Sequence, residues 1–387
     1  MAKSNKKHGN IYLDYAASVE ANPSSIHNLG LEAKNKLQNA RREVADVLGA
    51  RPSEIIFTSG GTESNNLAIQ GVIWAWRKNK KVLPHIITTN IEHPSVLETC
   101  KLLAERRLAE ISIVEVDANG IVDPKKIKKE IKENTVLISV MYANNEIGTI
   151  QPIKEIVKEI RHYRKQNLSL FPLLHTDAVQ AANYLDLNVE RLGVDLLSLS
   201  GSKIEGAGRV GVLYKKKSVP LVNIFGGGDQ EQGLRPGTEN LEAIIKFSEA
   251  LKFAQKIKEK EGERQTVLRD YFINKLQHSH ILKNVGMFFN GNLENRLPNN
   301  VNITFPKIPS DLLVIELSAK GIMASSKSAC KSSRAEGSYV IKALRPESDS
   351  EIGGVRFSLG KNTTKKDIDY TVKALSQILT KLKKWYD

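Results

Sequence analysis

The chain has 387 residues, of which 41% are hydrophobic and 26% are charged. This composition is typical of a soluble globular protein and excludes an intrinsically disordered chain, and the length fits one large domain with a smaller one. The formal net charge of +14 suits an acidic partner or substrate as well as it suits nucleic acid. Only two cysteines are present, Cys100 and Cys330, so a disulfide framework and a cysteine-rich zinc site are both excluded.

Seven short apolar segments in the first part of the chain are each long enough for one β-strand. Segments with the apolar spacing of a helix lie between most of them, at residues 64–77, 94–108 and 152–167. Near-continuous apolar strands that alternate with helices predict an α/β fold whose parallel sheet is buried on both faces. The predicted strands are residues 54–57, 85–89, 111–116, 136–142, 173–176, 196–199 and 211–214.

The pattern changes beyond about residue 241, where a long helix is predicted over 241–262 or further. Strands at 301–305 and 354–358 and a final helix after Thr364 predict a second, α+β domain. We therefore expect a large domain over residues 11–248 and a small domain over 249–387. Residues 1–10 are expected to be flexible or packed on the small domain. The segment 325–354 is predicted to be a long loop, and loops of that length are often functional.

Lysine-rich runs at 124–134, 256–263 and 381–385 have the spacing of charged helix faces. No nucleic-acid-binding motif accompanies them, so we expect no direct nucleic-acid binding. The spacing of the two cysteines has no local metal signature, and we expect no metal site. The polar N-terminal sequence, the few cysteines and the lack of an apolar run near ~20 residues predict a cytoplasmic protein without a membrane span.

The segment Thr58-Ser-Gly-Gly-Thr-Glu-Ser-Asn-Asn66 follows a predicted strand and begins a helix. Backbone N–H groups at a helix N-terminus bind anions, and Gly60 and Gly61 allow a phosphate to approach closely. The segment is neither a Walker motif nor GxGxxG, so a plain helix cap remains an equal alternative.

Asp177 and Lys203 stand at the ends of two successive predicted strands, where open α/β sheets bind their ligands. A lysine at such an edge is costly to bury unless it is paired or used covalently. The two side chains could hold a pyridinium aldehyde, with the carboxylate at the ring nitrogen and the lysine at the aldehyde. His93, after another strand, could stack on the ring. Taken singly, Asp177 is more simply a turn residue and His93 a loop histidine.

The two cysteines have different surroundings. Cys330 lies in a polar stretch between Lys327 and Lys331, and neighbouring positive charge favours the nucleophilic thiolate. Cys100 lies in an apolar helix pattern and is predicted to be an inert core residue.

In the order and spacing of its motifs the chain resembles the cysteine desulfurases of the class V aminotransferase family, in the type with a long cysteine loop. The resemblance covers nearly the whole chain and implies fold type I, with a mostly parallel seven-stranded sheet and a smaller α+β C-terminal domain. The motifs are Tyr12–Ala17, Asn22–His27, Thr58–Asn66, Glu92-His93, Asn144–Gly148, His175–Gln180, Ser200–Lys203, Gly226–Thr238, Ser328–Cys330, Arg356–Gly360 and Asp367–Asp369.

The resemblance implies pyridoxal 5'-phosphate as cofactor and assigns four residues to its ring. Lys203 would bind the aldehyde covalently, and Asp177 would bond the pyridinium nitrogen. Gln180 would contact the phenolic oxygen, and His93 would stack on the ring and act in proton transfer.

The cofactor phosphate has its own implied residues. Thr62 and Ser200 would bind it, with Gly61 contributing backbone and Ser202 a hydroxyl. Thr238 would reach the phosphate of a neighbouring subunit, which implies a homodimer with shared active sites.

The remaining implied residues act on the substrate, L-cysteine. Asn145, which also contacts the cofactor, and Arg356 would hold it, the arginine by a bidentate grip on its carboxylate. Cys330 would attack the substrate sulfur, leaving alanine and an enzyme persulfide. A sulfur-acceptor or iron–sulfur scaffold protein is the implied partner, and iron–sulfur cluster assembly or tRNA thiolation the implied use.

Four departures from the family pattern surround the site. Ser202 stands where relatives usually have a histidine before the lysine, and residues 205–209 replace a Gly-Pro-Lys-Gly sequence. The stretch between Ala17 and Asn22 is short, as though a helix were cut out, and Lys327 replaces a glycine. Two function classes therefore stay open: an active desulfurase, or a degenerate relative that binds or scaffolds other proteins. Selenocysteine lyase, a kynureninase-like hydrolase and a sulfur-independent aminotransferase are alternatives within the enzyme class.

Overall fold

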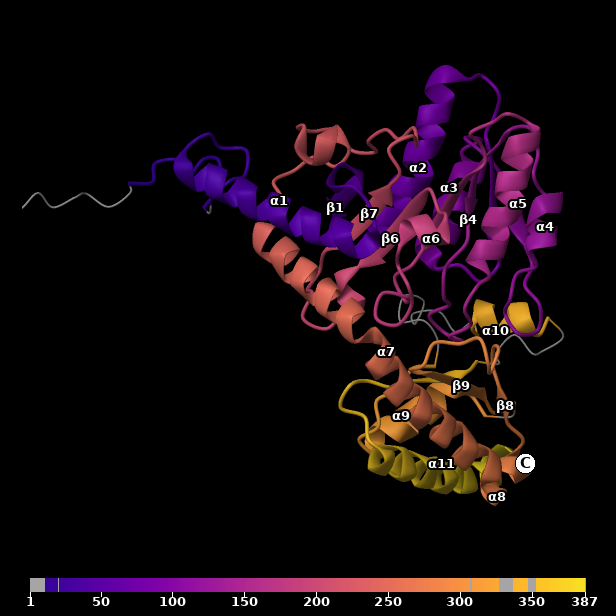
Figure 1. The fold of residues 1–387 in the computed structure, drawn as a ribbon. Helices are drawn as coiled ribbons and strands as arrows, with labels where there is room; N and C mark the ends of the chain where they lie inside the picture. The colour runs from indigo at the N-terminus through magenta and orange to yellow at the C-terminus, as the bar shows by residue number, and fades with distance from the viewer. Residues whose placement is uncertain (1–10, 20, 307, 327–336, 347–352, 387) are drawn as a thin grey trace, which may run out of the picture.

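The computed structural model describes residues 11–19, 21–306, 308–326, 337–346 and 353–386, and its strands form two sheets (Figure 1). All seven segments predicted as strands of the first sheet are strands, within a few residues of their expected bounds. They are β1 (Ile55–Thr58), β2 (His85–Thr89), β3 (Glu110–Val114), β4 (Thr135–Ser139), β5 (Leu173–Asp177), β6 (Leu196–Ser200) and β7 (Gly211–Lys215).

The large sheet has the strand order β1-β7-β6-β5-β4-β2-β3. The neighbours from β6 across to β3 pair in parallel, and β7 is antiparallel to both β6 and β1. This confirms the expected mostly parallel, seven-stranded sheet of an α/β fold. Parallel neighbours bring the carboxyl ends of successive strands to one edge of the sheet.

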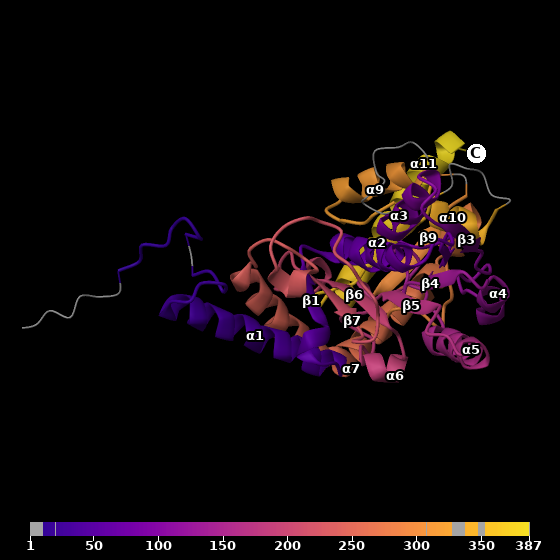
Figure 2. The same cartoon turned by 90° about the horizontal axis from the view of Figure 1, so that it is seen from above.

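Helices cover both faces of this sheet, with α2 and α3 on one side and α1, α5, α6 and α7 on the other (Figure 2). Adjacent strand residues enter different cores: Leu173 packs with α2 and α3, and Leu174 packs with the opposite layer. The near-continuous apolar strands are thereby explained. The helices of this part are α1 (Asn28–Leu48), α2 (Gly61–Asn79), α3 (Pro94–Glu105), α4 (Pro124–Lys129), α5 (Ile153–Gln166) and α6 (Val189–Leu192), with the short 3-10 helices η1 (Pro52–Glu54), η2 (Gly201–Lys203) and η3 (Gln230–Gly233).

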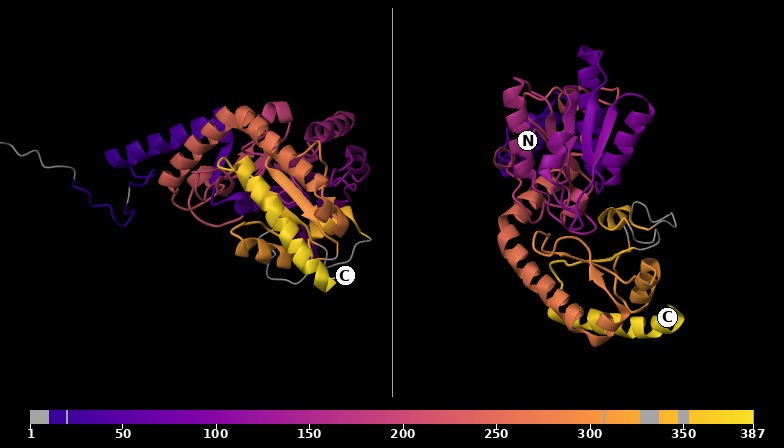
Figure 3. Two further views of the ribbon diagram at one scale, coloured as in Figure 1. Left: turned by 90° about the horizontal axis from the view of Figure 1, so that it is seen from below. Right: turned by 90° about the vertical axis from the view of Figure 1, so that its right-hand side faces the viewer.

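The long helix α7 (Leu241–His278) runs from the first sheet to the second, as the right-hand view of Figure 3 shows. Its first half contributes Phe247 and Leu251 to the large core, and its second half contributes Phe272 and Leu276 to a separate core. The boundary proposed between residues 248 and 249 falls inside this helix and stays a prediction. The second part contains β8 (Phe288–Phe289), β9 (Asn300–Thr304), β10 (Val355–Ser358), α8 (His280–Val285), α9 (Ser310–Ala319), α10 (Tyr339–Leu344) and α11 (Lys365–Tyr386).

The structure corrects the sequence interpretation at two helices. The predicted loop 325–354 contains α10, which is capped by the Ser338 hydroxyl and buries Val340, Ile341 and Leu344 against the large core. Long-range packing therefore stabilises a helix too short to predict from its own sequence.

Helix α1 was not predicted at all. Its apolar positions, Leu37, Val44 and Leu48 among them, are separated by charged residues but share the face that packs on α7. The helix ends at Gly49, whose φ of 62° is the left-handed conformation that glycine adopts most readily.

Candidate active site

Three side chains predicted to do chemistry come together because they follow neighbouring parallel strands. Asp177 is the last residue of β5, and Lys203 ends η2, directly after β6. His93 follows β2 and is the residue that caps α3. All three lie at the carboxyl edge of the sheet, where open α/β sheets bind ligands.

These side chains line one cavity of about 500 Å³ between the large sheet and the small one. A cavity of this size accommodates a cofactor-sized ligand. Among the described residues, every predicted site residue except Thr238 lines it. The predicted residues that it contains are Gly61, Thr62, His93, Asn145, Asp177, Gln180, Ser200, Ser202, Lys203 and Arg356.

One end of the cavity has the features of an anion site. Helix α2 begins here, and its N-cap residue, Gly60, makes no side-chain cap hydrogen bond. Gly61 packs so closely that a Cβ atom would lie 2.8 Å from Val179 Cγ2. The hydroxyls of Ser200 and Ser202 lie 3.0 Å apart at the same end. Uncapped N–H groups and clustered hydroxyls are donors suited to a phosphate.

The Asp177 carboxylate is buried and has a fixed orientation. Asn65 Nδ2 donates a hydrogen bond to one oxygen at 2.7 Å, and the Val179 N–H donates to the other at 3.0 Å. Both donors stabilise a negative charge at the cavity wall.

Lys203 is exposed and lines the cavity. The strand ends at Ser200, and the turn of η2 carries Lys203 out of the sheet. Asn183 Nδ2 donates to the Lys203 carbonyl at 2.7 Å and so holds this turn. Within the described part of the chain, no side chain pairs with the Lys203 ammonium.

The His93 imidazole also caps a helix, because its Nδ1 accepts the Ser95 N–H at 3.1 Å. The Ser95 hydroxyl lies 2.7 Å from the same nitrogen. Burial lowers the pKa of His93, and the Lys203 ammonium lowers it further against the opposing effect of Asp177. The ring is therefore neutral at neutral pH.

Glu92, the residue before His93, is a fully buried acid. Its Oε1 accepts from the Met141 N–H and the Thr89 hydroxyl, and burial raises its pKa to about 8. This residue was named in a motif but not predicted to be functional.

Arg356 reaches the cavity from β10 of the small sheet. Its Nη1 donates to the Asn145 carbonyl at 2.8 Å, and its Nη2 donates to the Ser325 hydroxyl at 3.3 Å. Burial lowers the pKa of this guanidinium and Glu146 opposes that effect, but an arginine keeps its charge. Asn145 Oδ1 is buried and has no hydrogen-bond partner among the described residues. A cation and an unpaired amide oxygen thus meet at the end of the cavity away from α2.

Cys330 lies outside the described residues, so its predicted role stays a prediction. Cys100 is buried in α3, as predicted, and burial raises the pKa of its thiol to about 12. Thr238 is exposed and does not line the cavity of its own chain. Sequence reasoning also missed Asn65 and Ser95, although Asn65 lies inside a quoted motif and Ser95 two positions after His93.

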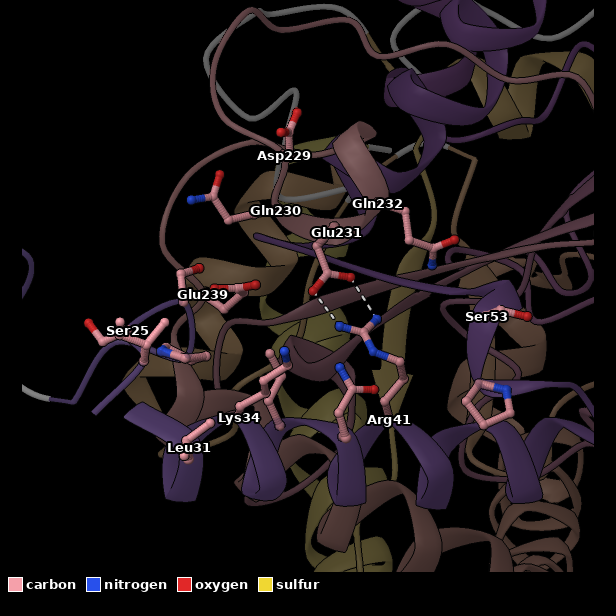
Figure 4. A pocket seen from close by; sticks show the side chains of 16 residues that line it. Ser25, Leu31, Lys34, Arg41, Ser53, Asp229, Gln230, Glu231, Gln232 and Glu239 are labelled. Atoms are coloured by element: carbon pink, nitrogen blue, oxygen red, sulfur yellow. Dashed lines mark hydrogen bonds and ion pairs between the residues drawn. The ribbon is translucent and has the colours of Figure 1, made fainter. Parts of the chain in front are cut away.

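A second cavity, of about 710 Å³, lies between α1 and the segment around η3. Figure 4 shows Arg41 of α1 reaching Glu231, to which it is joined by two hydrogen bonds. No residue predicted to do chemistry lines this cavity.

Neither a metal-binding cluster nor a membrane-spanning helix occurs among the described residues. They contain no group of three or more histidine, cysteine, aspartate or glutamate side chains placed to hold a metal ion. In the same part of the chain, every helix is too short or too polar to cross a membrane.

Comparison with known proteins places this site in a family. Residues 6–371 match the family model for class-V aminotransferases. The chain is 42% identical to a cysteine desulfurase IscS of Dictyoglomus turgidum, over 96% of this chain and 95% of that protein. It is also 42% identical to a cysteine desulfurase IscS of Methanosarcina thermophila, over 96% and 88% of the two chains. A solved NifS-like protein superposes with a TM-score of 0.82 at 36% identity, covering 93% of this chain and 91% of that one. The chain therefore belongs to the class-V aminotransferase family, among the cysteine desulfurases of the IscS type.

Proposed function

We propose that this protein is a cysteine desulfurase that uses pyridoxal 5'-phosphate to convert L-cysteine to L-alanine and an enzyme-bound persulfide. The observation that carries the proposal is the convergence of Asp177, Lys203, His93 and Arg356 on one cavity. These residues come from four separate elements, so only the fold brings them together.

The residues present fit the cofactor. The N-terminus of α2, Thr62 and the paired hydroxyls of Ser200 and Ser202 would hold its phosphate, in the space kept open by Gly61. Asp177 would hold the ring nitrogen of the cofactor, and Gln180 would contact its phenolic oxygen. The bound cofactor supplies an aldehyde that condenses with amines and a ring that stabilises the electron pair released at the substrate α-carbon.

The substrate end of the cavity is complementary to a zwitterionic amino acid. The Arg356 guanidinium would bind the carboxylate, and the unpaired Asn145 Oδ1 would accept from a donor of the bound ligands. The Asn145 carbonyl already orients Arg356, so the arginine loses little further conformational freedom when the substrate binds. Lys203, unpaired on the cavity wall, would exchange protons with the substrate. His93 would stack on the cofactor ring and act in proton transfer.

The sulfur step is assigned to Cys330 from the resemblance. Its thiolate would attack the substrate sulfur, so that an S–S bond forms while the substrate C–S bond breaks. The electron pair of that bond stays with the carbon skeleton, which takes up a proton and leaves as alanine. The persulfide would pass to acceptor proteins for iron–sulfur cluster assembly or tRNA thiolation. We propose a cytoplasmic location, where thiols stay reduced.

We further propose a homodimer in which Thr238 serves the partner's phosphate site. Thr238 is exposed and faces no ligand site of its own chain. The N-terminal arm before α1 supports association because it exposes large apolar side chains, including Leu13 at 89% and Ile26 at 94%. Patches of this kind on a soluble protein mark contact surfaces. Sedimentation equilibrium tests the dimer, and mixing Lys203→Ala with Thr238→Ala subunits should restore one complete site.

The deciding experiment is an assay of cysteine-dependent alanine and sulfide formation, with and without added pyridoxal phosphate. Formation of both products in equal amounts supports the proposal. A protein that binds no cofactor and releases no alanine would instead support the scaffold alternative, which Ser202 and the short N-terminal stretch favour. Selenocysteine offered in competition distinguishes a selenocysteine lyase.

A further inference from the structure

A continuous row of hydrogen bonds joins Asp177 to His93 through two residues that carried no predicted role. Asn65 Nδ2 lies 2.7 Å from Asp177 Oδ2 and 2.8 Å from Ser95 Oγ. Ser95 Oγ lies 2.7 Å from His93 Nδ1. The row connects β5, α2 and the start of α3, and all four residues line the candidate active site.

The charge of Asp177 fixes the direction of the first two bonds in this row. An ionised carboxylate only accepts, so the Asn65 amide must turn its NH₂ group toward Asp177. The second N–H of that group then donates to Ser95 Oγ. The Ser95 hydroxyl accepts there and keeps its own proton, which it can donate to His93 Nδ1.

A second observation fixes the direction of the last bond. The backbone N–H of Ser95 donates to His93 Nδ1 at 3.1 Å, and a backbone donor cannot reverse its role. Two donors therefore point at His93 Nδ1, which carries no proton. The proton of the neutral imidazole must lie on Nε2.

We infer that Asn65 and Ser95 are positioning residues that hold His93 in the neutral tautomer protonated at Nε2. Such a ring donates a hydrogen bond from Nε2 and cannot take up a proton at that nitrogen. The ring can take up a proton only at Nδ1, and only if Ser95 stops donating to that nitrogen. The inference deepens the proposed function, but the tautomer is a property of the folded chain and is measurable without turnover.

The pKa of His93 distinguishes this positioning role of Asn65 and Ser95 from a merely structural one. Among the described residues, Asp177 of β5 and Lys203 of η2 are charged groups that act on the ring. In Asn65→Ala, Ser95 Oγ loses the donor that occupies one of its two lone pairs, so it accepts a hydrogen bond from a protonated ring more readily. The His93 pKa should then rise, by roughly half to one pH unit for one hydrogen bond.

The test is a pH titration by NMR of the full-length protein labelled with ¹⁵N-histidine, with His93→Asn used for assignment. The parent should show the ¹⁵N shifts of the Nε2–H tautomer. Asn65→Ala should raise the His93 pKa, and the matched control Asn66→Ala, a change of the neighbouring asparagine of α2, should leave it unchanged.

A double-mutant cycle shows whether Asn65 acts through Ser95. In a Ser95→Ala background, Asn65→Ala should no longer shift the His93 pKa, whereas Ser95→Thr should keep the parent response. An equal shift in both backgrounds would mean that Asn65 acts through the charge of Asp177 alone, and would overturn the inference. A parent protein with the proton on Nδ1 would overturn it without any variant. Cysteine turnover is measured separately, so loss of the proposed function and loss of this inference are distinguishable.

Discussion

Arg41→Met should destabilise the protein strongly, because it removes one partner of an ion pair that is almost completely buried. Arg41 donates two hydrogen bonds to Glu231, at 2.7 and 2.6 Å, and one to the Ile55 carbonyl at 2.7 Å. The side chains are 7% and 1% exposed. In the variant, the donor that Glu231 would keep among the described residues is Phe57 N, 2.9 Å away.

Removal of one partner of a buried pair costs about 3–5 kcal/mol, because the other charge stays buried without compensation. Total stabilities are on the order of 5–15 kcal/mol, so the loss is a large fraction. For a domain of this size it corresponds to a fall in Tm on the order of 10 °C. The pair also anchors η3, where Glu231 and Gln232 have φ values of 49° and 63°, a left-handed conformation that costs energy in residues other than glycine. Thr238 follows this segment, so its position should loosen too.

Thermal unfolding followed by circular dichroism measures the effect. Arg191→Met is the matched control, since Arg191 pairs with Asp186 at 2.8 Å but is 65% exposed, and its loss should be at most about 1 kcal/mol. Adding Glu231→Gln to Arg41→Met should recover much of the stability, because no buried charge then remains. If Arg41→Met and the control lowered Tm equally, the argument from buried charge would be refuted.

Four further predictions follow from the site. Lys203→Ala should abolish covalent cofactor attachment and turnover; a variant that kept the visible absorbance of the bound cofactor would disprove the assignment. Ser202→His should tighten cofactor binding by about tenfold to a hundredfold, the value of one charge-assisted hydrogen bond, and equal dissociation constants in a cofactor titration would contradict this. A thiol reagent should label Cys330 before Cys100, which is buried with a pKa raised to about 12; mass spectrometry identifies the site, and label mainly on Cys100 would count against the roles given. Because the folded state keeps the Glu92 proton up to a pKa of about 8, against an ordinary value of 4.5, its contribution to stability is complete below pH 4.5 and is lost as the pH rises to 8. Glu92→Gln should flatten that dependence in unfolding midpoints measured from pH 5 to 8, and an unchanged slope would exclude Glu92 as its source.

The sequence predicted the central sheet well because its signal is local. A strand buried on both faces must be apolar at nearly every position, and each of the seven segments has that property whatever its neighbours are. The same reasoning placed Asp177 and Lys203 at one edge, since parallel strands share the edge at which they end. It could not predict that Lys203 would be exposed, because the turn of η2 after β6 decides that.

Other features depend on residues far apart in the chain. Helices α1 and α10 are too polar or too short to stand out locally, and they form because distant side chains cover their apolar faces. Arg356 meets Asn145 across 211 positions, and Asn65 meets Asp177 across 112.

The sequence by itself therefore determined the fold class, the strand order along the chain and the residue types that the chemistry needs. Only the tertiary structure decided how those residues act on one another: the cavity between the two sheets, the exposed position of Thr238, and the hydrogen bonds that orient His93 through Asn65 and Ser95. The physical reason is one of range. Hydrophobic periodicity depends on residues that are close together in the sequence. The direction of a hydrogen bond depends instead on the charge of the side chain that folding brings within about 3 Å.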